Sequence, residues 1–102
     1  MGVIVAFSIS PTATDESGSV SEAVAAAVRV VCDSGLPYEL NSMFTNVEGE
    51  WDEVMAVVKQ AVDVVAATSP RVGLVLKADI RPGYEGQLAA KVERVEQALA
   101  DS

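Results

Sequence analysis

The sequence predicts an α+β fold in which two helices cover one face of a four-stranded antiparallel sheet and a third helix follows at the C-terminal end. Three observations predict this fold class. Some segments carry large apolar residues at every second position, as strands do, and others carry them three and four positions apart, as helices do. The two kinds follow one another in the order strand, helix, strand, strand, helix, strand, helix. Right-handed crossovers fold that order into a sheet of this kind.

The first strand and the first helix occupy the N-terminal third of the chain. Large apolar residues alternate with small ones over residues 3–9, which predicts a strand. After a polar loop, Ser19 and Glu22 have the spacing of a capping box, so a helix should begin near Val20. Gly35 supplies its left-handed stop. The apolar stripe of this helix comprises Val20, Ala23, Val24, Ala27, Val28 and Val31.

Two short strands and the second helix follow. Residues 36–41 and 43–47 are β-forming runs with a brief connection, which predicts an antiparallel hairpin. Acidic residues just after Gly49 suit the positive end of a helix dipole, so the second helix should open there. It should stop at Pro70. Its predicted core side comprises Trp51, Val54, Met55, Val58, Ala61, Val62 and Val65.

The last strand and the last helix complete the pattern. Residues 72–80 are rich in aliphatic and β-branched side chains, with Lys77 and Asp79 on one face. A turn-rich link leads to a helix with one narrow apolar stripe. The seven elements form a ferredoxin-like βαββαβ sandwich with an additional C-terminal helix, and we expect a single domain over residues 1–102. The stripe comprises Leu88, Val92, Val95 and Leu99.

The predicted sheet has one face that no helix covers. We interpret the side chains on both faces as largely apolar or small, and an uncovered face of this kind is unfavourable in contact with water. Together with the stripe of the last helix, this predicts that the chain is buried against copies of itself as a homo-oligomer. Lys77 and Asp79, two positions apart in a strand, are most readily explained as charges that pair across the subunit contact.

Composition excludes several functional classes. Seven basic and fifteen acidic residues give a net charge of −8, which disfavours nucleic acid and anionic membranes as partners. There is no histidine and one cysteine, Cys32, so an internal disulfide, Cys/His zinc sites and histidine-dependent triads are excluded. No acidic cluster matches a metal-binding loop, and we expect no metal and no cofactor. The apolar start is too short for a bilayer span, which indicates a cytoplasmic protein.

Four segments carry a resemblance to a known family. They are Gly-Leu-Pro-Tyr-Glu-Leu at 35–40 with Met43 and Thr45 after it, Glu-Gly-Glu-Trp-Asp-Glu-Val at 48–54, Ser-Val-Ser at 19–21, and Lys-Val-Glu-Arg-Val-Glu at 91–96. On these residues nearly the whole chain resembles the thiamine-binding protein family, formerly a conserved family of unknown function. The resemblance implies a homotetramer, assembled as a dimer of dimers whose sheets pack together. It also implies that the protein binds thiamine or its hydroxymethylpyrimidine moiety as a carrier or sensor, and that it is not an enzyme.

Candidate ligand contacts follow from the chemistry of thiamine. Its flat aminopyrimidine and cationic thiazolium call for a carboxylate or amide, an aromatic or thioether face, and hydroxyls. We expect Glu39 to accept a hydrogen bond from the exocyclic amine and Met43 or Phe44 to cover a ring face. The ring edge is assigned to Ser10, Asn41 and Thr45, with Ser8 beside them at the end of the first strand. Ser42 and Phe44 stand where members of the family typically have Pro and Gly.

Two other interpretations stay open. A ligand-free scaffold or interaction oligomer could use the same assembly, with Glu39 as an edge-strand charge that blocks unwanted pairing. A small enzyme could use Glu39 and Lys77 as acid and base, but no spacing in the sequence is specific for it.

Overall fold

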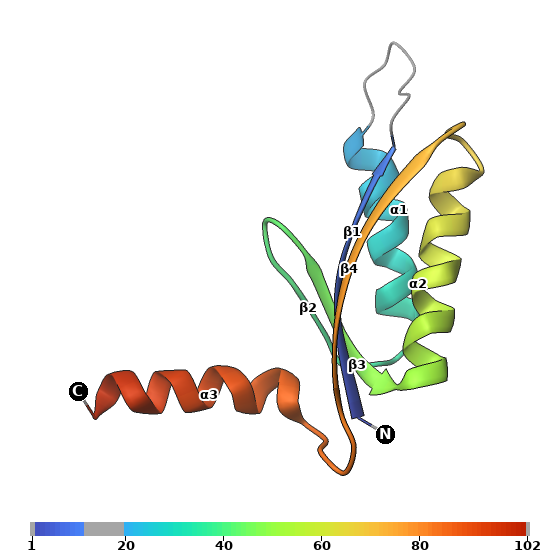
Figure 1. The fold of residues 1–102 in the computed structure, drawn as a ribbon. Helices are drawn as coiled ribbons and strands as arrows, with labels where there is room; N and C mark the ends of the chain where they lie inside the picture. The colour runs from blue at the N-terminus through green and yellow to red at the C-terminus, as the bar shows by residue number, and fades with distance from the viewer. Residues whose placement is uncertain (1, 12–19, 102) are drawn as a thin grey trace.

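The computed structural model describes residues 2–11 and 20–101, so Ser19 and the loop before it lie outside the described residues. Strands and helices follow in the predicted order (Figure 1). The elements are β1 (Gly2–Pro11), α1 (Val20–Asp33), β2 (Tyr38–Leu40), β3 (Thr45–Glu50), α2 (Trp51–Ala66), β4 (Val72–Arg81) and α3 (Gln87–Ala100). No described helix combines the length and the apolar character that a membrane span requires.

The four strands form one antiparallel sheet in the order β2-β3-β1-β4. β1 pairs with β4 along its whole length, from Gly2 opposite Arg81 to Pro11 opposite Val72. Its pairing with β3 is shorter and ends at Phe7 opposite Thr45. Figure 1 shows α1 and α2 side by side on one face of the sheet. The predicted ferredoxin-like fold with an added C-terminal helix is therefore confirmed.

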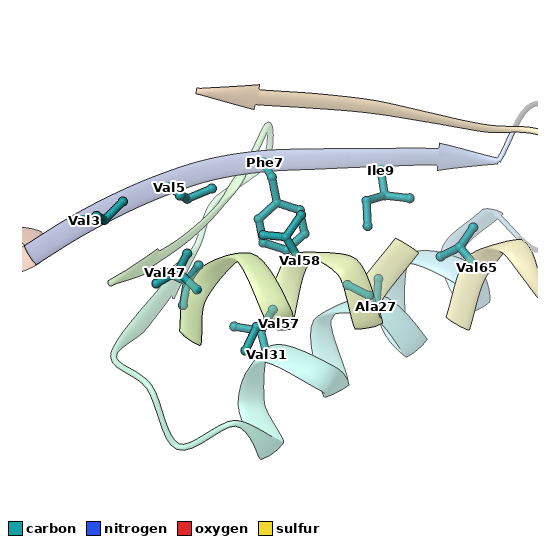
Figure 2. Packing of buried hydrophobic residues seen from close by; sticks show 12 residues of the cluster. Val3, Val5, Phe7, Ile9, Ala27, Val31, Val47, Val57, Val58 and Val65 are labelled. Carbon is teal, nitrogen blue, oxygen red and sulfur yellow. The ribbon is translucent and has the colours of Figure 1, made fainter. Parts of the chain in front are cut away.

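The core lies between the sheet and the two covering helices (Figure 2). Alternation in β1 directs every second side chain toward α1 and α2, because successive side chains of a strand point to opposite faces. Full burial of one such aliphatic side chain stabilises the fold by about 1.5–3 kcal/mol. The buried cluster comprises Val3, Val5, Phe7, Ile9, Ala27, Val31, Val47, Val54, Val57, Val58, Ala61 and Val65.

The hairpin strands differ from their predicted bounds. β3 begins at Thr45 and not at residue 43, because Met43 and Phe44 belong to the turn. The side-chain Oδ1 of Asn41 accepts hydrogen bonds from the backbone N–H of Met43 at 2.9 Å and of Phe44 at 2.8 Å. β3 then continues to Glu50, since Glu48, Gly49 and Glu50 pair with β1. β2 is likewise shorter than residues 36–41.

Trp51 does not lie on the core side of α2 as predicted. It is the first residue of the helix and is 38% exposed, because α2 begins directly after β3 and its first residue lies at the margin of the core. Val57, which was not predicted, is buried instead.

The face of the sheet opposite α1 and α2 is more polar than predicted. The cross-strand register places Ile4 between Glu48 and Asp79, and Ala6 between Asn46 and Lys77. The expectation that this face is largely apolar or small is therefore wrong. Charged residues lie on this face because side chains of β3 and β4 point alternately to the two faces of the sheet, and the polar positions of both strands fall on the open side.

α3 projects away from the sheet on that open side (Figure 1). The carboxylate of Glu48 accepts hydrogen bonds from the backbone N–H of Gln87 at 2.8 Å and of Leu88 at 3.4 Å. The ammonium of Lys91 pairs with the carboxylate of Asp79. No described residue of α3 is buried, and Val92, Val95 and Leu99 are 46%, 60% and 68% exposed.

Candidate functional site

β1 extends beyond the end of its neighbour β3. Residues 8–11 of β1 pair with β4 but have no partner in β3, whose pairing stops at Phe7 opposite Thr45. Figure 1 shows the tip of the β2–β3 hairpin diverging from β1 at this point. Backbone N–H and C=O groups on the β3 side of residues 8–11 therefore have no sheet partner there and can hydrogen-bond to a ligand.

A pocket of about 240 Å³ occupies the space between the end of β1, the hairpin tip and α1. Its walls are mixed, with aliphatic side chains from the helix and polar groups from the strand and the turn. Such a mixture is typical of small-molecule sites, in which a few polar groups orient a ligand held by apolar contacts. The described lining comprises residues 7–10, Val24, Ala27, Val28 and residues 40–45.

Six of the seven candidate ligand contacts line this pocket, and they come from two separate parts of the chain. Their role in binding stays a prediction. They are Ser8, Ser10, Asn41, Met43, Phe44 and Thr45.

Glu39 does not line the pocket. It lies in β2 opposite Asn46, and the row continues through Ala6 to Lys77 across the open face of the sheet. Glu39 points away from the helices, while Leu40, the next residue, lines the pocket. Ser8 and Ser10 alternate in phase with Ala6, so their side chains also point to the open face, and they border the pocket at the end of β1.

Asn41 contributes one end of its amide to the hairpin. Oδ1 accepts two backbone hydrogen bonds from the turn, and the backbone N–H of Asn41 donates to the carbonyl of Phe44 at 3.0 Å. The residue lies in this turn and not in the second strand, which was predicted over residues 36–41. The side-chain NH₂ group is the part that can donate to a ligand acceptor.

The pocket has a buried base and an exposed rim. Thr45 is only 6% exposed and lies opposite Phe7, so its hydroxyl is held at a fixed position. Met43 is 73% exposed at the turn. Its flexible thioether can pack over a flat ring that enters the pocket.

Two other aromatic side chains near the hairpin and α2, Tyr38 and Trp51, do not line the pocket. Tyr38 is in β2, where a hydrogen bond with the Cys32 thiol raises the pKa of its phenol. Trp51 starts α2. Sequence reasoning missed the aliphatic wall of the pocket, which Val24 and Val28 of α1 form. The available signal was the width of the apolar stripe of α1, which is greater than contact with the sheet requires.

An acid–base pair of Glu39 and Lys77 is not formed within one subunit. Their backbones are separated by three strand spacings, or about 14 Å, so no proton can pass directly between the two side chains. Within residues 2–11 and 20–101, no three His, Cys, Asp or Glu side chains are grouped so that they could hold a metal ion.

Comparison with known proteins identifies relatives along the whole chain. The family model described as "Thiamine-binding protein" matches residues 5–96. A UPF0045 protein of Mycobacterium bovis is 51% identical over 100 residues, covering 97% of this chain and 96% of the relative. The structure of a domain of unknown function, DUF77, from Bacillus cereus has a TM-score of 0.80 at 34% identity, covering 89% of this chain and 86% of that one. A Thermotoga maritima structure, to which a role in thiamine biosynthesis or salvage is attributed, has a TM-score of 0.76 at 26% identity, with coverages of 91% and 99%.

Proposed function

The chain belongs to the thiamine-binding protein family, and on this premise we propose that it binds thiamine, or the hydroxymethylpyrimidine moiety of the vitamin, without transforming it. The observation that carries the proposal is the pocket at the end of β1, which gathers six candidate contacts around one cavity. The protein would act in the cytoplasm as a carrier or sensor of the vitamin.

The pocket chemistry suits the edge of an aminopyrimidine. The NH₂ group of Asn41 donates to a ring nitrogen, whereas the hydroxyl of Thr45, on the helix side of the hairpin, can donate or accept. The unpaired backbone edge of residues 8–11 offers further donors and acceptors to the same plane. Val24 and Val28 supply an apolar surface for the ring face.

The size of the pocket favours one ring over the whole vitamin. Sites that enclose a drug-sized ligand have volumes of about 300–1,000 Å³, and this one has about 240 Å³. The cationic thiazolium then lies at the rim, near Met43, where the net charge of −8 favours a cation. Glu39 can contact the ligand only if another subunit of the proposed homotetramer places the Glu39 of its own open face beside the rim of this pocket.

Calorimetric titration tests the proposal with two conservative variants. Thr45→Val removes a hydroxyl at nearly constant shape, and Asn41→Asp keeps the Oδ acceptor of the turn but removes the NH₂ donor. Each should weaken binding of neutral hydroxymethylpyrimidine about fivefold to tenfold, since one hydrogen bond contributes about 1–1.5 kcal/mol. Asn46→Asp, the same change on the open face, is the matched control.

Two results would contradict the proposal. If thiamine, its phosphates and hydroxymethylpyrimidine at millimolar concentration give neither a heat of binding nor a rise in melting temperature, the proposed ligand is ruled out. Conversion of any of these compounds during incubation, abolished by Glu39→Gln, would indicate an enzyme.

One observation favours a second candidate function, an interaction oligomer without a small ligand. The apolar stripe of α3 is exposed along most of its length, as in a helix that packs against a partner. This candidate predicts a stable assembly together with no response to any of the compounds above.

A further inference from the structure

A second cavity lies directly beside the ring pocket at the end of β1. It is an open hollow of about 840 Å³ on the surface of α1, and we call it the α1 cavity. Val24, Val28 and Leu40 line both cavities, so they form a shared aliphatic wall. A ligand that fills the ring pocket can therefore extend over this wall into the α1 cavity. The other described lining residues of the α1 cavity are Ala25, Arg29, Cys32 and Asp33.

Arg29 is the basic residue of this region. Among the described lining residues of the two cavities it is the one lysine or arginine. It directly follows Val28 of the shared wall, and within the described part of the chain its guanidinium forms no ion pair. Arginine suits a phosphate group well, because its planar guanidinium can donate two parallel hydrogen bonds to phosphate oxygens.

We propose that the α1 cavity holds the phosphate group of a phosphorylated form of the vitamin, with Arg29 as its partner. The inference rests on the proposed function, which assigns the pyrimidine ring to the pocket at the end of β1. That pocket has about 240 Å³ and leaves the remainder of the ligand outside. In thiamine phosphates the phosphate group is carried by the thiazolium part of the molecule. It therefore lies outside the ring pocket, which the α1 cavity adjoins along Leu40.

The charges around Arg29 determine where an anion can bind. The net charge of −8 disfavours anions over the molecule as a whole, so a phosphate group needs a local cation. Asp33, one turn further along α1, is the other charged residue among the described lining of the α1 cavity, and its carboxylate repels a phosphate. Arg29 also borders a groove toward α2, where Glu22 and Asp33 place two carboxylates. The α1 cavity is therefore the more favourable side of Arg29 for a phosphate group.

Parallel calorimetric titrations with thiamine and thiamine monophosphate test the inference. The wild-type protein should bind the monophosphate about threefold to tenfold more tightly than thiamine, as expected for a charged hydrogen-bonded pair at an exposed site. Arg29→Gln should lower this ratio of affinities to about one, and Arg29→Lys should retain part of it, because an ammonium keeps the charge but not the paired donors. Asp33→Asn should raise the ratio. Lys59→Gln removes an exposed positive charge from α2, so it is the matched control and should leave the ratio unchanged.

Three results overturn the inference while the proposed function stands. The first is a wild-type protein that binds thiamine but binds the monophosphate no more tightly. The second is an unchanged ratio in Arg29→Gln, which would mean that the phosphate group lies elsewhere. The third is a ratio that does not rise in Asp33→Asn, a variant that tests the same cavity without removing Arg29. If neither compound binds to the wild-type protein, the proposed function fails and this inference fails with it.

Discussion

Glu48 connects two segments that are distant in the sequence. It is 7% exposed in β3, and its carboxylate caps the first turn of α3 through the N–H groups of Gln87 and Leu88. The first N–H groups of a helix have no partner within it, and a carboxylate there also meets the positive end of the helix dipole. Glu48 therefore fixes where α3 leaves the sheet.

Removing that carboxylate should loosen α3. Glu48→Ala leaves the N–H groups of Gln87 and Leu88 without their acceptor, and we expect a loss of about 1–2 kcal/mol in the free energy of unfolding. Urea denaturation gives this loss, and hydrogen exchange of the two amides should become faster. Glu93→Ala, on the exposed surface of α3, is the control and should change neither quantity. Unchanged exchange in Glu48→Ala would contradict the capping role.

Single residues also show the limits of sequence reasoning about the site. Residue type and position along β1 and the hairpin predicted the six contacts that line the pocket. Glu39 was grouped with them, because its position in the sequence does not reveal that the row through Asn46 lies on the other face. Glu48 caps α3 through Gln87 and Leu88, which lie 39 and 40 positions further along the chain. No local sequence pattern indicates such a contact.

At the scale of elements, helices were easier to predict than short strands. Each helix carries a stripe over three or four turns, so its bounds follow from many residues. β2 and β3 are short, and two backbone hydrogen bonds accepted by the side chain of one residue, Asn41, move the start of β3 by two positions. The four-stranded antiparallel sheet with both covering helices on one face could be predicted, since right-handed crossovers leave few alternatives.

The contact between α3 and β4 depends on pH. The ammonium of Lys91, through its hydrogen bond and its charge, holds the pKa of Asp79 below the ordinary value of 3.8. Because this pKa is lowered on folding, the pair contributes stability that is fully present above the ordinary pKa. That stability is lost as pH falls through the lowered one.

Lys91→Met should return the pKa of Asp79 toward its ordinary value. An NMR titration of the Asp79 carboxyl measures this shift, and the stability difference from the wild type should be present at neutral pH and vanish below the folded-state pKa of Asp79. Lys59→Met, which removes the exposed pair with Asp63, is the control and should leave the titration of Asp79 unchanged. A titration of Asp79 that is the same in Lys91→Met and the wild type would contradict this cause.

At the scale of the whole molecule, α3 stands apart from the compact part of the fold (Figure 1). Its stripe was predicted from spacing, but its direction was not, because that direction is set by the capping contact of Glu48 and the pairing of Lys91 with Asp79. The open face carries several charges, so the case for self-association rests on the exposed stripe of α3 more than on that face.

A charge on the stripe should weaken assembly. Val92 is 46% exposed in the middle of the stripe, and Val92→Glu would place a carboxylate in the proposed subunit contact. Light scattering should report about four subunits for the wild type and fewer for Val92→Glu. Gln97→Glu adds the same charge on the opposite side of α3 and should leave the assembly intact. Equal effects of the two variants would mean that the stripe is not the contact.

The location of the ligand is the most direct test of the central claim, which is that the opening between β1 and the hairpin holds the pyrimidine ring. Titration of thiamine into isotopically labelled protein, followed through the backbone amide resonances, locates the bound ring. We expect saturable shifts concentrated at residues 8–10 and 41–45, with one ligand per subunit. Shifts centred on Glu39, Asn46 and Lys77 of the open face, or no shifts at millimolar thiamine, would contradict the claim.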